Sequence, residues 1–487
     1  VANLIIEDRW VEAILYEKAP YWSPLPILFA AAERASLQLF GPSETALRLI
    51  PCMLGVGTVP VIAALAGHAA PSHERHLKVT AIAFFILVGL NPNAIHYSSQ
   101  VKQFSGQLFF AALLLLNHEK LRQTDYSAML PYVWHVAVSA IAVLYSVSLN
   151  LFVPVLSAVL FVKGLRKSPR LALRLFVPLM IVVGALAVSH YLFWLQPQLD
   201  PDYATSTWSD YWYPAVGIGP FVEWIVRRVA SFLRFDFEYQ SLVPIGLVTV
   251  ALAILFSIIG FVSLLRKRSV VVVLYVGLVA AQFAFAIARV FPFGGSRLTL
   301  YLLVFHAWFA AVGLSRLINA NWSVFSRLWL RRSVTVLLLA SLFPFAGIAS
   351  ELLPAKGNEE MRPLVRELAN TYDSDRDSVY VYWGAIEAFD FYWDRDTDFG
   401  TDDTVYFGFH IQGRHEMSDL PLYVGDVRRF VAELPEEIER VHMVFSHVGT
   451  DWMYEKTEMV RAARNELNSK PATTSFDGTW LYTFVLP

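Results

Sequence analysis

The sequence predicts a polytopic α-helical membrane protein with a C-terminal soluble α/β domain. Three observations favour this fold class: 56% of the 487 residues are hydrophobic, only 16% are charged, and the charges are unevenly distributed. Residues 351–487 hold 26 acidic and 13 basic residues, whereas residues 1–350 hold 15 acidic and 26 basic residues. An ordinary soluble domain has about 25% charged residues. A soluble globular enzyme, a disordered chain and a nucleic-acid-binding protein are therefore disfavoured.

Apolar runs that suit a hydrocarbon layer about 30 Å thick recur along the first part. They lie at 46–67, 77–93, 104–117, 130–147, 149–163, 170–194, 243–265, 269–290, 298–317 and 333–350. The apolar stretch 26–40 is shorter, and we expect it to lie in the membrane interface or to dip into it, which gives ten or eleven helices. Between residues 49 and 197 the only carboxylates are Glu74, Glu119 and Asp125, and all three fall in connections. This placement is expected because a charge inside lipid is costly.

Basic residues mark alternate connections, and the positive-inside rule assigns those connections to the cytoplasm. They are Arg75, Lys78, Lys120, Arg122, Lys163, Arg166, Lys167, Arg170, Arg174, Arg266, Lys267, Arg268, Arg316, Arg327, Arg331 and Arg332. The intervening connections, near 91–103, 147–149, 195–242 and 290–297, carry few cations. We therefore expect them, the N-terminal segment and the tail after 351 to face the outside.

The longest outer loop, 195–242, is rich in aromatic residues and contains an amphipathic segment. Residues 221–229 have apolar side chains at helical spacing beside Arg227 and Arg228, a pattern typical of a helix that lies on the membrane surface. Such a helix can cover a lipid-facing groove. It can equally be part of an aromatic belt in which the arginines reach out to the headgroups.

The tail predicts alternating helices and strands, which favour a mostly parallel sheet. We expect helices at 359–372, 386–392, 424–434 and 453–467, and strands at 378–384, 404–408, 441–448 and 480–486. No nucleotide-binding signature follows the first strand. His442 and His447 are five residues apart on one strand and therefore project to opposite faces, which argues against a shared metal. Cys52 is the only cysteine, so no intrachain disulfide is expected.

Several ordered motifs resemble those of the GT-C glycosyltransferases. They are Glu17–Pro20, Leu39–Leu49, Asn91–Ser105 and Pro292–Arg297. The closest groups are bacterial relatives of the protein O-mannosyltransferases and of the lipid A aminoarabinose transferases. The tail segments Val379–Gly384 and Val444–Val448 are similar to the extracytoplasmic domain of one bacterial branch. The resemblance thus covers nearly the whole chain.

The resemblance implies three regions in a multi-pass protein of the bacterial inner (cytoplasmic) membrane. Residues 1–45 form a first outer loop with interfacial helices, and 46–353 form the transmembrane GT-C-like core with its outer loop 195–242. Residues 354–487 form a periplasmic, extracytoplasmic α/β domain. The implied partners are a lipid-linked sugar donor, membrane lipids and further membrane protein subunits, and no nucleic acid.

The resemblance also implies a reaction in which a sugar leaves a polyprenyl phosphate for an acceptor on the outer face. An aspartate in the first outer loop, usually followed by Glu, would activate the acceptor hydroxyl as a base or with a divalent cation, the one cofactor implied. Lys18 and Arg297 would hold the departing phosphate. Tyr97, Gln100 and Lys102 would line the same cavity.

The sequence departs from this family pattern in two places. The expected first membrane helix and the Asp-Glu pair after it would precede Val1, and the in-chain carboxylates Glu7 and Asp8 lie in a segment that resembles an exposed helix face. The second outer loop carries Gln100 and Gln107 where related sequences have carboxylates, and residues 91–118 contain no acid. Glutamine can hydrogen-bond but cannot accept a proton at neutral pH.

Two hypotheses remain open from the sequence. In the first, the protein is an active membrane glycosyltransferase. In the second, it is a degenerate, catalytically inactive member of the fold that serves as a structural or assembly subunit of a membrane complex. The retained cations Lys18, Lys102 and Arg297 favour the first hypothesis, and the missing carboxylates favour the second.

Overall fold

A computed structural model gives the fold of the chain. It describes residues 25–41, 43–69, 74–123, 129–198, 211–212, 217–237, 243–319, 335–336, 361–396, 405–408, 420–446, 453–476 and 478–487. The chain divides into two compact units, one formed by Val11–Leu353 and the other containing Pro354–Pro487. The two units are described separately.

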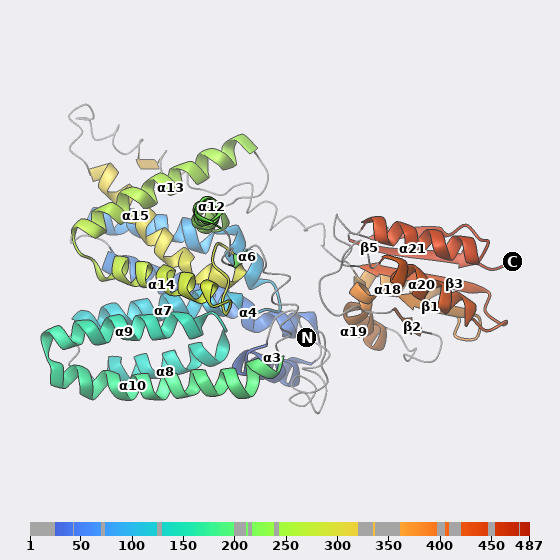
Figure 1. Cartoon of the computed structure of the whole chain (residues 1–487), viewed down its shortest axis with the longest axis horizontal. Coiled ribbons are helices and arrows are strands. Elements are labelled where there is room, and N and C mark those ends of the chain that lie inside the picture. Colours follow the sequence, from blue (N-terminus) through green and yellow to red (C-terminus); the bar gives the residue numbers. More distant parts are fainter. Residues whose placement is uncertain are drawn as a thin grey trace. The chain divides into compact units, whose positions relative to one another are not determined.

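The larger unit is a bundle of helices (Figure 1). In chain order these are α3 (Ile27–Phe40), α4 (Glu44–Ala69), α5 (Glu74–Phe84), η1 (Phe85–Gly89), α6 (Pro92–Ser98), α7 (Phe104–Gln123), α8 (Met129–Tyr145), α9 (Leu149–Lys167), α10 (Pro169–His190), η2 (Tyr191–Leu195), η3 (Gln196–Gln198), α12 (Ile218–Phe237), α13 (Val243–Arg266), α14 (Val270–Ile287), η5 (Arg297–Leu302) and α15 (Leu303–Asn319). The predicted polytopic helical fold class is confirmed.

Six helices of the described part are long and apolar enough to cross a membrane. They are Glu44–His68, Leu149–Arg166, Phe176–Gln198, Thr249–Arg266, Val270–Ile287 and Arg297–Ile318. The predicted span 77–93 is bent: Lys78–Gly89 and Pro92–Ser98 meet at 53°. The predicted spans 104–117 and 130–147 coincide with α7 and with α8, which is a shorter apolar helix. The predicted span 333–350 lies almost wholly outside the described residues.

The centre of the bundle is α15, which is buried along nearly its whole length. It crosses α13 at two glycines, Gly260 and Gly313, whose backbones touch. A Cβ atom at either position would overlap a backbone oxygen of the facing helix, that of Phe309 or Phe256. Small residues at a crossing allow the close backbone approach that drives helix packing in membranes.

The short helix α3 is fixed by hydrogen bonds at both ends. At its start, the Leu25 backbone N–H donates to Gln198 Oε1 (2.8 Å), and Trp194 Nε1 donates to the Leu25 carbonyl (2.6 Å). Toward its end, Ser36 Oγ donates to the Ala46 carbonyl of α4 (2.6 Å). Helix α3 is therefore held against η2 and η3, which follow α10, and against the start of α4.

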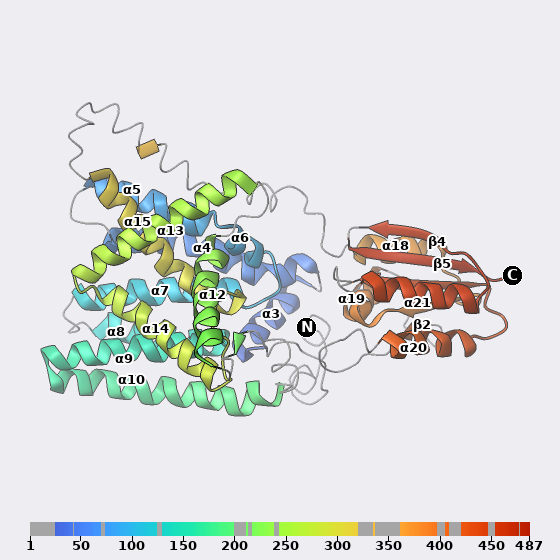
Figure 2. The same ribbon diagram turned by 45° about the horizontal axis from the view of Figure 1, so that its top comes forward.

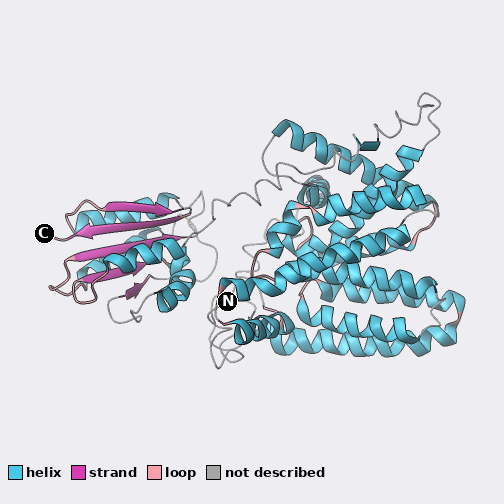
Figure 3. Ribbon diagram, turned by 180° about the vertical axis from the view of Figure 1, so that it is seen from behind, coloured by secondary structure: helices cyan, strands magenta, loops and turns pink. Residues whose placement is uncertain are grey.

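The tail folds around a five-stranded sheet of order β2-β1-β3-β5-β4 with helices on both faces (Figure 3). Its elements are α18 (Met361–Thr371), β1 (Asp377–Val381), η7 (Trp383–Ala385), α19 (Ile386–Asp396), β2 (Val405–Phe407), α20 (Leu420–Ala432), β3 (Arg440–Ser446), α21 (Met453–Glu466), β4 (Ala472–Phe476) and β5 (Thr479–Val485). The pairs β1–β2 and β1–β3 are parallel, whereas β3–β5 and β4–β5 are antiparallel. The prediction of a mostly parallel sheet is therefore wrong: the sheet is mixed, because β5 and the edge strand β4 pair antiparallel.

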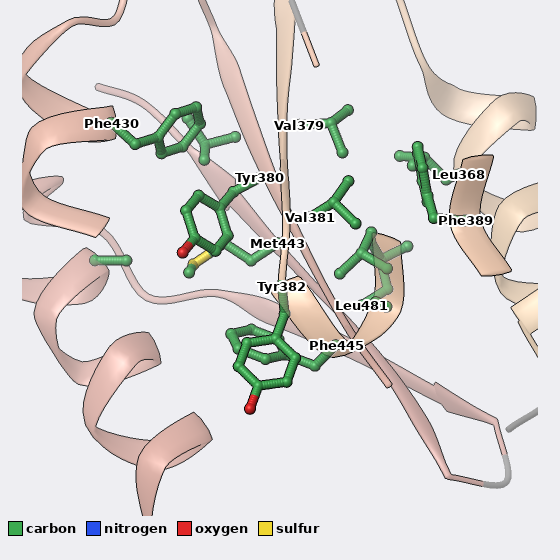
Figure 4. Close-up of a cluster of buried hydrophobic side chains, with 14 of the residues drawn as sticks. Leu368, Val379, Tyr380, Val381, Tyr382, Phe389, Phe430, Met443, Phe445 and Leu481 are labelled. Carbon is green, nitrogen blue, oxygen red and sulfur yellow. The ribbon is translucent and has the colours of Figure 1, made fainter. Parts of the chain in front are cut away.

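Both faces of β1, which lies between β2 and β3, are buried. Figure 4 shows Val379 and Val381 on the side of Leu368 of α18 and Phe389 of α19, with Tyr380 on the other side near Phe430 of α20. A strand covered on both faces is apolar throughout rather than alternating, which explains the continuous Val-Tyr run in the sequence.

The strand β4 was not expected from the sequence. Its residues Ala472–Ser475 are exposed, because β4 lies at the edge of the sheet and pairs only with β5. A polar edge strand lacks the apolar alternation that identifies a half-buried strand. The turn to β5 contains Gly478 with φ of 70°, a left-handed conformation that glycine adopts without strain.

Candidate functional site

The first part of the candidate site is the connection between α6 and α7, in the predicted second outer loop. Asn91 caps α6, since its side chain accepts a hydrogen bond from the Ala94 N–H (3.2 Å), and Pro92 occupies the first turn. Such a start is favourable because Pro needs no hydrogen bond there. The short helix carries Tyr97, whose ring packs edge-on against Phe104 at 5.1 Å. Tyr97 is thereby held beside the first turn of α7.

The residues that follow α6 fold back on it. Gln100 Nε2 lies 2.6 Å from His96 Nε2, a hydrogen bond within one helical turn. The Lys102 side chain is exposed. Gln103 is buried, and its Oε1 accepts the backbone N–H of Val147 at the turn between α8 and α9 (2.8 Å). This hydrogen bond joins two of the predicted outer connections.

Arg297 lies at the first residue of η5, which begins with a capping box. Ser296 Oγ accepts the Leu298 N–H, and the Ser296 N–H donates to Thr299 Oγ1 (2.9 Å). The Arg297 guanidinium carbon lies 5.7 Å from the centre of the Phe104 ring. Its charge also interacts with the Tyr97 hydroxyl. Tyr97 and Arg297, far apart in sequence, therefore meet at Phe104.

A second arginine reaches the same loop from α12. Ser231 Oγ accepts the Gly295 N–H (2.8 Å), and Gly294 has φ of 131°, a conformation suited to glycine. A Cβ atom at Gly294 would lie 3.0 Å from Arg228 Cδ. The Arg228 guanidinium carbon lies 4.1 Å from the centre of the Tyr211 ring, and Arg228 Nε is buried with no hydrogen-bond partner among the described residues.

Aromatic packing holds α12 on the bundle, where it runs across the direction of α9 and α10 (Figure 2). Trp224 of α12 is buried against Phe293 of the loop (5.5 Å) and Phe283 of α14 (6.2 Å). The opposite face is an exposed apolar stripe made of Ile218, Val222, Val226 and Val229. A helix with one face on protein and one apolar face exposed fits a position at the membrane surface, as the sequence predicted for this loop.

The structure thus brings together two of the residues that the resemblance implied, Tyr97 and Arg297. Gln100 follows Tyr97 by three residues, and its side chain is hydrogen-bonded to His96. The Lys102 side chain is exposed. Lys18, Glu7 and Asp8 lie outside the described residues. The convergence of Lys18, Lys102 and Arg297 on one cavity therefore stays a prediction.

Arg228 was not selected as a site residue from the sequence. It was grouped with arginines that reach out to headgroups, because the sequence does not show that α12 packs on the loop before Arg297. A signal was nevertheless present. Arg228 is four residues after Trp224, which places it on the aromatic, protein-facing side of the helix.

The chemistry available here is anion binding. Within the described residues, no ion pair joins Arg228 or Arg297 to a carboxylate, and both guanidinium groups lie against aromatic rings. A guanidinium presents several N–H donors in a planar fork that matches phosphate oxygens. The described residues contain no group of three or more His, Cys, Asp or Glu side chains that could hold a metal ion.

Among the comparisons with known proteins, the one with solved structures finds similar proteins. No protein-family model and no curated protein sequence matches the chain. The structure is similar to that of ArnT from Cupriavidus metallidurans in the apo state, with 13% identity, 99% of this chain and 91% of that chain covered, and a TM-score of 0.54. It is also similar to the Archaeoglobus fulgidus oligosaccharyltransferase tethered with an acceptor peptide containing the NVT sequon, with 12% identity, coverage of 99% and 68%, and a TM-score of 0.52. The chain therefore shares its fold with these proteins, the GT-C-like fold that the sequence predicted, in a multi-pass membrane protein.

Proposed function

We propose that the protein is a membrane glycosyltransferase that moves a sugar from a polyprenyl phosphate to an acceptor on the outer face of the bacterial inner membrane. The fold supports this proposal, since the similar structures include an oligosaccharyltransferase tethered with an acceptor peptide. At low sequence identity the fold alone does not define an activity, so the proposal depends on the geometry of the site.

The observation that carries the proposal is the pair of arginines on the loop 291–297. Arg297 lies in that loop, and Arg228 packs against it at Gly294. When the sugar leaves, negative charge develops on the phosphate of the carrier lipid, and fixed cations stabilise it.

The acceptor must also lose a proton, and the described part of the site offers no carboxylate to accept it. Residues 91–118 contain no acid, and Gln100 is bonded to His96. In our proposal the carboxylate comes from the first outer loop, either from Glu7 and Asp8 or from an Asp-Glu pair encoded before Val1. A divalent cation could bind with that carboxylate.

The missing carboxylates also favour a second candidate function. In this alternative the chain keeps the phosphate site of an ancestral transferase but has lost catalysis, and it serves as a structural or assembly subunit beside other membrane proteins. The two candidates share the lipid-binding site and differ in turnover.

A binding experiment tests the shared site. Undecaprenyl phosphate is titrated into the detergent-solubilised full chain, and the dissociation constant is measured for wild type, Arg297→Gln and Arg228→Gln. Each substitution removes a charge-assisted contact worth about 2 kcal/mol, so we expect about 30-fold weaker binding. Arg227→Gln is the matched control. Arg227 is next to Arg228 in the sequence, but it is exposed and forms an ion pair with Glu223 one turn earlier. Equal affinities in all four proteins would contradict the proposal.

A genetic experiment tests the transferase. A strain lacking the gene is complemented with wild type or with the double variant Arg228→Gln/Arg297→Gln, at equal protein abundance, and its lipid-linked sugars and surface glycans are analysed. A transferase requires both arginines, so the double variant should not restore the wild-type glycan profile. Full restoration by the double variant would favour the structural subunit.

A further inference from the structure

The end of the bundle opposite Arg297 carries a second cluster of charged side chains. Helix α7 begins beside Arg297 and has 20 residues, so it ends about 30 Å away. At this far end, Lys163 of α9 interacts electrostatically with Arg122 and Glu119 of α7 and with Arg166 of α9. The cluster is fixed to neighbouring helices, since Asn117 Nδ2 donates to the Pro131 carbonyl of α8 (3.0 Å).

The charges in this cluster do not balance. Glu119 is 5% exposed, and its carboxylate is already engaged: Arg122 Nε donates to one oxygen (2.8 Å), and His118 Nδ1 lies 3.4 Å from the other. In the described part of the chain, neither Lys163 nor Arg166 forms an ion pair. Lys163 therefore lies in the field of two other cations, Arg122 and Arg166, and of one carboxylate that Arg122 already pairs with, and an anion bound beside Lys163 would relieve the repulsion.

The surroundings of the cluster are apolar and exposed. Val162, next to Lys163, is 49% exposed, and the start of α8 presents Met129 and Leu130 at 64% and 81%. In a membrane protein such side chains face the acyl chains of lipids. A ligand that matches both features has an anionic head and a hydrocarbon tail.

We propose that Arg122, Lys163 and Arg166 bind the phosphate headgroup of an anionic phospholipid whose acyl chains lie against α8 and α9. This site is about one membrane thickness from the Arg228–Arg297 pair and is independent of the transfer reaction. Basic pockets between transmembrane helices recognise anionic headgroups through this combination of charge and apolar contact. A free phosphate ion would share the cations but would gain nothing from the apolar surface.

Native mass spectrometry on the full chain in detergent tests this proposal. The probes are dioleoyl phosphatidylglycerol, dioleoyl phosphatidylcholine and inorganic phosphate, and the proteins are wild type, Lys163→Gln/Arg166→Gln and the control Arg266→Gln/Lys267→Gln. We expect wild type and control to retain phosphatidylglycerol in preference to phosphatidylcholine, and the first variant to bind it about 30-fold more weakly. The charge-conserving variant Lys163→Arg/Arg166→Lys should bind like wild type, which excludes misfolding as the cause.

Three results would overturn the proposal. The first is equal retention of phosphatidylglycerol by wild type and Lys163→Gln/Arg166→Gln. The second is an equal loss in the control variant, which would indicate a nonspecific effect of net charge. The third is displacement of the lipid by millimolar inorganic phosphate, which would make the free ion the ligand.

Discussion

Glu33 should make the stability of the bundle depend on pH. It lies on the buried face of α3 and is 0% exposed, and its two carboxylate oxygens have no hydrogen-bond partner among the described residues. Burial raises the pKa of Glu33 from 4.5 to about 8, because the charged form loses its hydration. The perturbation is Glu33→Gln, which keeps the shape and removes the titration.

The raised pKa of Glu33 makes the bundle less stable as pH rises. The folded bundle binds a proton at Glu33 more tightly than the unfolded chain does, so this contribution to stability is complete below pH 4.5 and is lost as pH rises through 8. A pKa of about 8 in place of 4.5 corresponds to a loss of about 5 kcal/mol. Two ionisable groups of the described residues contact α3: Tyr145 of α8 interacts electrostatically with Glu33, and His190 Nε2 at the end of α10 accepts the Ile27 N–H (3.3 Å).

The assay is thermal unfolding of the full chain in detergent between pH 5 and 9. Wild type should lose about 10 °C more than Glu33→Gln across this range. Glu44→Gln is the control, because Glu44 is a partly exposed carboxylate paired with Arg48, and it should follow wild type. Parallel curves for wild type and Glu33→Gln would show that Glu33 is hydrated or paired, and would refute the reasoning.

Three further substitutions have defined outcomes. Gly313→Leu should separate α13 from α15, because a side chain there meets the Phe256 backbone; a loss of several kcal/mol should appear as a lower unfolding temperature, and an unchanged value would contradict the packing. Gly294→Ala should displace Arg228 and weaken undecaprenyl phosphate binding about 10-fold in the same titration, at a stability cost of about 1–3 kcal/mol because φ at Gly294 is 131°; unaltered affinity would contradict the contact with Arg228. Asp377→Asn should destabilise the tail by about 3 kcal/mol in urea unfolding of the full chain followed at the tail. Burial opposes the charge of Asp377, but hydrogen bonds from His442 and Arg440 lower its pKa, so wild-type stability should fall as pH drops below 3.8 and the variant should not show this fall.

The sequence was most informative where burial is uniform. Hydropathy located the spans that became α4, α9, α10, α13, α14 and α15, since lipid requires long apolar runs. In the tail, the apolar segments Val379–Val381 and Val441–Phe445 are strands covered on both faces. The edge strand β4 was not predicted, because its exposed Thr and Ser residues give the same sequence pattern as a loop.

The site was only partly predictable, for a topological reason. Tyr97 and Arg297 came from the family resemblance, and their meeting point, Phe104, is fixed only when η5 packs on α7. Arg228 depends on a contact between residues more than 60 positions apart, at Gly294. Amphipathic spacing predicts that α12 has two different faces. It does not predict which element packs on the face that carries Trp224.

The exposed stripe of α12 has a mechanical consequence. The same helix that presents Ile218, Val222, Val226 and Val229 outward carries Arg228 on its inner face. A force that lifts or tilts this stripe, such as a thinner leaflet or tighter headgroup spacing, is therefore transmitted over one helix diameter to the guanidinium. If Arg228 binds the carrier phosphate as we propose, its affinity should therefore change with the physical state of the surrounding lipid.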